Sequence, residues 1–167
     1  MRRPAGFTII EMIVVLLLMS IIAATVLGRS ITSTDLDLSA QTDKLRNHLR
    51  YAQSMAMKTA YNDYPVWGIK SAGGQYWLFR GTNPDNAANE VRLAGMDYSG
   101  TSNRISTADL SVSLNGFTVF FDRIGRPYSA YSSSTNKTAL SGQMTVTVTS
   151  GSQSRAITVE PETGLVR

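Results

Sequence analysis

Glu11 is the most informative side chain of this sequence, because it is the one charged group between Phe7 and Leu27. The segment reads FTIIEMIVVLLLMSIIAATVL and is otherwise apolar apart from a few small hydroxyl residues. Insertion scales put an acidic group at the centre of a lipid-embedded helix at a cost of about 2.5–3.5 kcal/mol. A carboxylate in this position therefore indicates a partner of opposite charge.

Residue types that support catalysis or metal binding are otherwise scarce. The 167 residues include no Cys and a single His, His48. This composition excludes disulfides, thiolate zinc sites and cysteine nucleophiles, and it disfavours a histidine-based catalytic triad. The motifs G-x-x-x-x-G-K-[ST], H-E-x-x-H and G-x-S-x-G are all missing from the sequence. We therefore expect no enzyme activity, no metal and no cofactor.

Two close carboxylate pairs and the histidine are expected to be ordinary surface groups. Asp35 and Asp37 are two residues apart, so they face different sides of a helix. Glu160 and Glu162 flank a proline at the end of a predicted strand, and exposure is the usual state of such carboxylates. His48 lies among polar neighbours without a second ligand, so we expect a solvated helix residue.

The apolar segment has the length of a membrane span. A helix over residues 7–28 rises about 1.5 Å per residue and covers roughly 30 Å, the thickness of a bilayer core. Arg2 and Arg3 predict a cytoplasmic N-terminus, with the rest of the chain on the other side. A cleaved secretory signal is disfavoured, since the apolar run is long and contains Glu11. Its best candidate for a signal-peptidase cleavage site, Ile22-Ala23-Ala24, is a poor match to the A-x-A pattern. A plain anchor explains length and orientation but leaves Glu11 unexplained.

The segment Gly6-Phe7-Thr8-Ile9-Ile10-Glu11 resembles the class III signal of type IV pilins and type II secretion pseudopilins. The resemblance implies that residues 1–6 are a leader, removed by a prepilin peptidase that cuts between Gly6 and Phe7. It also implies that Phe7 is then N-methylated and that Glu11 is the fifth residue of the mature chain. Residues 7–28 would first anchor the chain in the inner membrane and then form part of a filament core.

Glu11 then has a physical role in assembly. Cleavage would expose an ammonium group at Phe7, and the Glu11 carboxylate of one subunit can pair with the amine of its neighbour in a filament. Misalignment would leave a buried charge without a partner, so the pair would set the register between subunits. The cost of the carboxylate in lipid also favours transfer from the bilayer into the filament.

Residues 29–60 are expected to form an amphipathic helix that lies on a globular domain. Apolar residues recur there at helical spacing, with polar residues between them. They are Leu38, Leu45, Leu49, Ala52 and Ala56. Residues 61–65 mark the end of this helix. Gly28 and the Ser/Thr-rich residues 30–39 leave two alternatives, a continuous rod from Phe7 or a bend.

Residues 61–167 are expected to be rich in β-strands, which makes the fold class α+β, a long helix followed by short antiparallel sheets. Strand patterns predict paired strands at 66–80, 110–121 and 144–160. The second pair is expected to be a hairpin that turns at Asn115-Gly116. Residues 81–103 are expected to be a surface excursion with a short strand at 90–93, and residues 128–142 a Ser/Thr-rich loop.

Two segments near the C-terminus support a narrower resemblance. Phe121-Asp122-Arg123-Ile124-Gly125-Arg126-Pro127 is similar to the F-x-x-x-G-R-P element of the GspH/FimT domain, and residues 157–166 are similar to its closing strand and turn. The resemblance implies a periplasmic domain of this type over residues 61–167. Gly125 and Gly164 are expected to serve turns with positive φ or a close approach of the backbone.

The combined resemblance implies a minor pseudopilin of a type II secretion system. Such a subunit would be an assembly or tip component of the periplasmic pseudopilus and would support protein export across the outer membrane. The alternative is a FimT-like type IV minor pilin that serves pilus assembly or DNA uptake. The partners implied are other pseudopilins or pilins, the prepilin peptidase, the inner-membrane assembly platform and the secreted substrate.

Charge disfavours DNA as a partner. The net charge of the chain is +4, and removal of the leader would subtract Arg2 and Arg3. DNA-binding pilins of the FimT type carry a basic motif after the closing glycine, here Gly164. In this sequence Leu165 replaces a basic residue and Arg167 alone remains. A single C-terminal Arg on a chain with a small net positive charge provides little electrostatic attraction for nucleic acid.

Overall fold

The computed structural model separates the chain into two compact units, Met1–Ser33 and Thr34–Arg167. The residues that it describes are 8–27, 33–59, 65–96, 98 and 101–167. The predicted cleavage site between Gly6 and Phe7 lies outside these residues. So does the linking segment 28–32, on which the alternatives of a rod and a bend depend.

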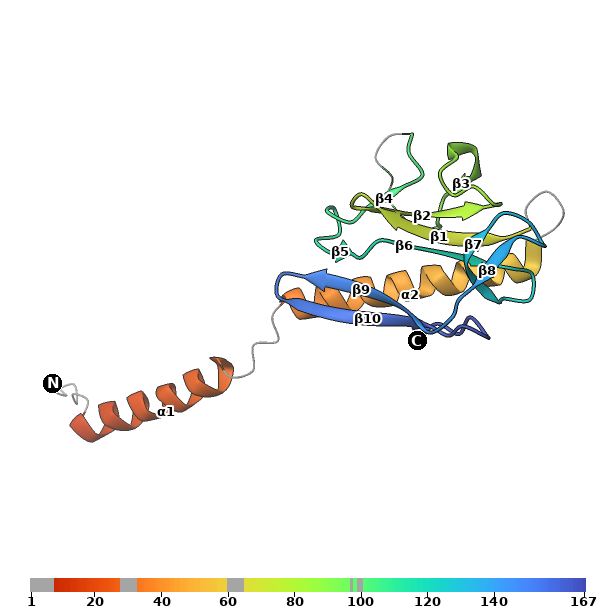
Figure 1. Ribbon diagram of the computed structural model, residues 1–167. Coiled ribbons are helices and arrows are strands. Elements are labelled where there is room, and N and C mark those ends of the chain that lie inside the picture. The colour runs from red at the N-terminus through yellow and green to blue at the C-terminus, as the bar shows by residue number, and fades with distance from the viewer. Residues whose placement is uncertain (1–7, 28–32, 60–64, 97, 99–100) are drawn as a thin grey trace. The chain divides into compact units, whose positions relative to one another are not determined.

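The described part of the first unit is helix α1 (Ile9–Leu27), at the N-terminal end of the colour bar in Figure 1. Its first turn is capped by Thr8, whose Oγ1 accepts a hydrogen bond from the backbone N–H of Glu11 at 3.3 Å. Every residue from Thr8 to Ala24 is exposed. Among the described residues, no helix combines the length and the mean hydropathy that a membrane span requires.

Helix α2 (Ser33–Thr59) confirms the predicted amphipathic helix. The apolar residues at helical spacing are all buried, with at most 3% of their surface exposed. They are Leu38, Leu45, Leu49, Ala52 and Ala56. These side chains belong to the same buried cluster as residues of two antiparallel sheets. The helix therefore forms the centre of the second unit's core, as the periodicity predicts.

The larger sheet has seven antiparallel strands within the described residues. Six lie in the order β3-β2-β1-β6-β7-β8, and β4 also pairs with β2. The strands are β1 (Trp67–Ala72), β2 (Gln75–Arg80), β3 (Glu90–Val91), β4 (Ile105–Ser106), β6 (Phe117–Phe121), β7 (Pro127–Tyr131) and β8 (Lys137–Ala139). The predicted β1–β2 hairpin is confirmed, with Gly73 and Gly74 at φ +60° and +73° in its two-residue turn. A short 3-10 helix, η1 (Ala87–Asn89), precedes β3.

The smaller sheet, again within the described residues, has the strand order β10-β9-β5. Its strands are β5 (Ser113–Leu114), β9 (Met144–Ser150) and β10 (Gln153–Val159). The strict alternation that predicts β9 and β10 is confirmed, because Val146, Val148 and Ile157 are buried while their neighbours are more exposed. An isolated bridge from Val159 to Val166 brings the C-terminal residues back to β10.

The hairpin predicted at Asn115-Gly116 is wrong. Strand β5 pairs with β9, whereas β6 pairs with β1, so the chain crosses from one sheet to the other at this point. The side chain of Asn115 explains the crossing. Its Oδ1 accepts from the backbone N–H of Thr147 at 2.7 Å, and its Nδ2 donates to the carbonyl of Thr145 at 3.2 Å. Asn115 therefore binds the edge of β9 instead of closing a tight turn.

The loop predicted at residues 128–142 is also wrong, because β7 and β8 form an antiparallel pair there. Tyr128 and Tyr131 supply the buried face of this pair, and their rings meet edge to face with centroids 5.5 Å apart. The other positions of the two strands are mostly small or polar and exposed. Two aromatic residues in so polar a segment produce only a weak periodic signal.

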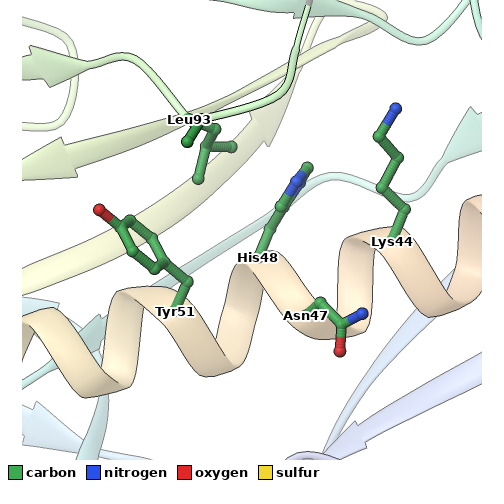
Figure 2. A pocket seen from close by; sticks show the side chains of 6 residues that line it. Lys44, Asn47, His48, Tyr51 and Leu93 are labelled. Carbon is green, nitrogen blue, oxygen red and sulfur yellow. The ribbon is translucent and has the colours of Figure 1, made fainter.

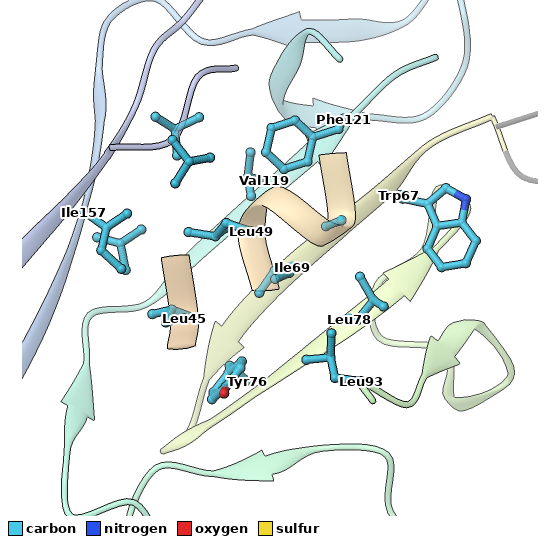
Figure 3. Close-up of a cluster of buried hydrophobic side chains, with 14 of the residues drawn as sticks. Leu45, Leu49, Trp67, Ile69, Tyr76, Leu78, Leu93, Val119, Phe121 and Ile157 are labelled. Atoms are coloured by element: carbon cyan, nitrogen blue, oxygen red, sulfur yellow. The ribbon is translucent and has the colours of Figure 1, made fainter. Parts of the chain in front are cut away.

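The main core lies where α2 meets both sheets (Figure 3). Leu49 of α2, Ile69 and Val119 of the larger sheet, and Ile157 of the smaller one are all members of this cluster. A second buried cluster contains Val66, Trp77, Phe79, Phe120, Tyr128 and Tyr131. Strand β2 contributes to both clusters, because alternate side chains of a strand point to opposite faces of its sheet. The larger sheet is therefore buried on both faces.

Candidate functional site

The first candidate site is the apolar surface of α1. Its described large apolar side chains are between 47% and 82% exposed, the upper value belonging to Ile9. Glu11 lies in the first turn of this helix and is its one acidic residue there. Exposure of an apolar surface of this extent to water is unfavourable, so such surfaces are normally covered by lipid or by other apolar helices. The exposed side chains of α1 therefore form a surface that other apolar groups can cover.

The Glu11 carboxylate is exposed and forms no ion pair with any described residue. Its position three residues after Thr8 matches a capping box, and the positive end of the helix dipole contributes about 0.3–1 kcal/mol there. That gain is smaller than the cost of an acidic group in lipid, about 2.5–3.5 kcal/mol. The helix-capping interaction alone therefore does not offset the free-energy cost of moving this carboxylate from water into lipid. The other two predicted site residues, Gly6 and Phe7, lie outside the described residues.

Gln53 joins the two C-terminal segments that the sequence singles out. Its Nε2 donates to the carbonyl oxygen of Gly125 at 2.9 Å and to that of Thr163, also at 2.9 Å. Gly125 and Gly164 have φ values of +80° and +66°, which confirms that both serve turns in the left-handed region. Gly164 also lies against the Gly125 carbonyl, where a side chain would clash. Sequence reasoning missed Gln53, because nothing in its local pattern distinguishes it from an exposed helix residue.

Asp122 organises the turn that contains Gly125. Its Oδ1 accepts hydrogen bonds from the backbone N–H groups of Ile124 and Arg126, both at 3.0 Å. Its Oδ2 accepts from the hydroxyl of Tyr128 at 3.0 Å. A buried carboxylate with three donors is a structural group, because its hydrogen-bonding capacity is used to hold the backbone. This F-x-x-x-G-R-P segment is therefore a folded turn that presents Gly125 to α2.

The predicted surface carboxylates Glu160 and Glu162 are positioned by nearby groups. Glu162 is paired with Arg126 at 2.8 Å, and its side chain is 75% exposed. Glu160 accepts from the Nε2 of Gln143 at 2.9 Å and lies 3.7 Å from Arg167. Each has its own cation, so the pair is not arranged as a catalytic acid and base. In the part of the chain that the structure describes, no cluster of three metal-binding side chains occurs.

The prediction that His48 is a solvated residue is wrong. The side chain is 9% exposed, and its Nδ1 lies 3.2 Å from the hydroxyl oxygen of Tyr76 on β2. Burial, followed by the nearby positive charge of Lys44, lowers the pKa of His48 from 6.5 to about 4. The spacing contained the correct signal: His48 lies three residues after Leu45 and four before Ala52, on the buried side of the helix.

Beside His48 lies a surface groove of about 370 Å³, which we name the His48 groove. Its lining residues are Lys44, Asn47, His48, Tyr51, Leu93 and Ala94. Figure 2 shows Lys44, His48 and Tyr51 rising from the same side of α2, with Leu93 opposite them from the segment after β3. Their positions on α2 follow the spacing i, i+3, i+4 and i+7, which places side chains on a single helix face.

Comparison with known proteins identifies the N-terminal segment. Residues 1–27 match the family described as the prokaryotic N-terminal methylation motif. No curated protein and no solved structure matches the chain significantly. The matched residues include Gly6, Phe7 and Glu11, so the predicted pilin-like signal is confirmed at the level of this motif.

Proposed function

We propose that this chain is a subunit of a pilin-like filament that is processed at Gly6-Phe7 and assembled through α1. The observation that carries the proposal is the match of residues 1–27 to the prokaryotic N-terminal methylation motif. That motif is typical of proteins whose apolar N-terminal helix is first a membrane anchor and then part of a filament. The exposed apolar side chains of α1 support the same proposal.

In this proposal a prepilin peptidase removes residues 1–6 and methylates the new N-terminal residue, Phe7. The chain is then anchored in the inner membrane by α1, with the unit Thr34–Arg167 in the periplasm. The partners of the chain are other pilins or pseudopilins and the inner-membrane assembly platform. The protein acts by assembly and carries out no chemical reaction itself.

Glu11 is the residue that we assign to subunit register. Its carboxylate has no cation among the described residues, and a helix packed in a filament core would remove it from water. A buried charge that loses its partner destabilises an interface by about 3–5 kcal/mol. The N-terminal ammonium of a neighbouring subunit supplies that partner, so a subunit shifted by one helical turn is penalised.

More specifically, we assign the chain to the minor pseudopilins of type II secretion, at or near the tip of the pseudopilus. The support is the similarity of residues 121–127 and 157–166 to the GspH/FimT domain. These two segments lie far apart in sequence, and Gln53 binds both, to the carbonyls of Gly125 and Thr163. Their shared contact with α2 supports treating them as parts of one folding unit.

The proposal is tested at the cleavage site. The full-length protein would be expressed with and without a prepilin peptidase, and its intact mass and N-terminal sequence would be determined. Loss of residues 1–6 and the addition of one methyl group to Phe7 are expected only when the peptidase is present. A chain that keeps Met1, or one that is cut near Ala24, would overturn the pilin-like assignment.

The assignment to type II secretion needs a separate test. Deletion of the gene in its native host should block export of secreted proteins while leaving pilus-dependent motility and DNA uptake unchanged. Loss of motility or of DNA uptake with normal export would instead identify a minor pilin of the type IV system. Cleavage at Gly6-Phe7 is expected in both cases, so this experiment separates the two systems independently of processing.

A further inference from the structure

The His48 groove lies within the unit Thr34–Arg167, and its chemistry is that of a binding site. It combines polar side chains of α2 with an apolar wall from Leu93 and Ala94. Small-ligand sites in proteins have this composition, a mostly apolar cleft with a few convergent polar groups. Its volume of about 370 Å³ lies at the lower end of the range for such sites, about 300–1,000 Å³.

Tyr76 determines what His48 offers to the groove. Burial raises the pKa of the Tyr76 hydroxyl, so it keeps its proton, and a buried phenol requires an acceptor. We assign the acceptor role to the Nδ1 of His48, which lies 3.2 Å from this hydroxyl oxygen. A neutral imidazole that accepts at Nδ1 carries its proton on Nε2. His48 therefore has an N–H donor left for a ligand.

Lys44 adds a positive charge to the same face of α2, one helical turn before His48. Among the residues that the structure describes, no carboxylate lines the groove and no ion pair joins Lys44 to an acidic group. A cation beside a neutral hydrogen-bond donor is the complement of an anion. A carboxylate suits this pair better than a phosphate, because its single negative charge matches one Lys, whereas a phosphate carries a charge of about −1.5 to −2.

We propose that the His48 groove binds a carboxylate attached to a small apolar group. The ammonium of Lys44 acts as the counter-ion, and the Nε2–H of His48 donates a hydrogen bond to the carboxylate. Leu93, Ala94 and the ring of Tyr51 contact the apolar part. The carboxylate belongs either to a free organic acid or to an acidic side chain of a protein partner. This inference does not depend on the N-terminal motif.

The single histidine gives this proposal a direct probe, since the full chain has one imidazole signal. Tag-free full-length protein in detergent micelles is titrated with sodium benzoate, and with benzamide as its uncharged match, while the His48 ring is followed by NMR. We expect saturable binding of benzoate with a Kd of about 1 mM or tighter, and binding of benzamide weaker by about tenfold. Bound benzoate should also raise the pKa of His48, because a nearby carboxylate stabilises the imidazolium.

Lys44→Gln should weaken benzoate binding by about fivefold or more, because the counter-ion is lost. Lys58→Gln is the matched control, since Lys58 is exposed in the last turn of the same helix and should leave binding unchanged. Equal affinity for benzoate and benzamide, the absence of a saturable shift, or equal affinity in the Lys44→Gln variant would each overturn the proposal.

A second experiment separates the two sources of the carboxylate. A photo-crosslinking phenylalanine in place of Tyr51 of the full chain is activated in cells that express the native assembly system. A protein adduct that Lys44→Gln abolishes assigns the carboxylate to a protein partner. No adduct, together with saturable benzoate binding, assigns it to a free organic acid. An adduct that is unchanged by Lys44→Gln would contradict carboxylate recognition by this groove.

Discussion

Gly164 packs so closely against Gly125 that a Cβ atom on Gly164 would lie 2.3 Å from the carbonyl oxygen of Gly125. The contact joins the closing turn of the chain to the turn that follows β6. Both glycines also have positive φ, which strains any other residue, and at Gly164 the short distance adds a steric clash. A side chain added at Gly164 would therefore disturb both turns.

Gly164→Ala should therefore destabilise the second unit by about 2–4 kcal/mol, through backbone strain of about 1 kcal/mol and overpacking of about 1–3 kcal/mol. Gly151→Ala is the matched control, since Gly151 has φ +59° and nothing within 4 Å of an added Cβ. The Gly151→Ala variant should lose only the stability that backbone strain costs, about 1 kcal/mol. Urea unfolding followed by the fluorescence of the buried Trp67 and Trp77 measures both variants. Equal decreases in the free energy of unfolding of the two variants would show that the close contact at Gly164 does not contribute to the loss of stability.

Gln53→Ala should destabilise the same region, because two backbone carbonyls lose their donor. A loss of about 1–2 kcal/mol is expected, because the hydrogen bond to Gly125 is partly buried while the one to Thr163 is exposed. Gln143→Ala removes one exposed hydrogen bond to Glu160 and should cost less than about 0.5 kcal/mol. The same unfolding measurement compares them, and a Gln53→Ala variant as stable as Gln143→Ala would contradict a joining role for Gln53.

His48 should make stability depend on pH. Its pKa falls from 6.5 to about 4 in the folded chain, so between these values the unfolded chain binds a proton that the folded chain does not. The free energy of unfolding should therefore decrease as the pH falls from about 6.5 to about 4, by up to 1.4 kcal/mol per pH unit. Below about pH 4 both states are protonated and this contribution levels off.

His48→Gln isolates this contribution from that of the carboxylates. Glutamine can still bond to Tyr76 but does not titrate, so the variant should lose the part of the slope that lies between about pH 6.5 and pH 4. Urea unfolding at a series of pH values in this range measures the slope. If the variant and the parent chain have the same slope, the buried imidazole does not hold the pKa described above.

Glu11→Ala should insert and be cleaved normally but fail to assemble. Alanine is less costly than a carboxylate in lipid, so insertion should not suffer. In the filament, the ammonium of the neighbouring subunit would lose its partner, a change that costs about 3–5 kcal/mol. Glu11→Gln should be intermediate, since its amide accepts a hydrogen bond without charge. Crosslinking to other filament subunits in membranes measures assembly, with Glu162→Ala, an exposed carboxylate of the other unit, as the control.

The unit from Thr34 to Arg167 should fold without α1, because its core is formed by α2 and the two sheets. A fragment that starts at Ser33 should show mixed helix and strand signals in circular dichroism. It should also show a near-UV signal from its buried aromatic side chains and a cooperative thermal transition. A fragment without either the near-UV signal or the transition would show that folding requires residues before Ser33.

Local pattern predicted much of the fold correctly, and its failures have identifiable causes. The helix over 33–59 and the hairpin of β1 and β2 were within reach of the sequence, because each depends on the period of its own side chains. The Asn115-Gly116 prediction failed because an Asn side chain can bind a distant strand as well as form a turn. The β7–β8 pair was missed because its buried face consists mainly of two tyrosines. Most other positions are small or polar, so the apolar alternation that predicts a strand is weak.

The same division holds for the candidate sites. Gly6, Phe7 and Glu11 are recognisable from the sequence, because they belong to one contiguous segment that matches the N-terminal methylation motif. Gln53, the Gly125–Gly164 contact and the His48 groove bring together residues from α2, the β6–β7 turn, the C-terminal turn and the segment after β3. Their roles depend on distances across the core, which only tertiary packing sets, because no local period encodes which strand lies beside which helix face.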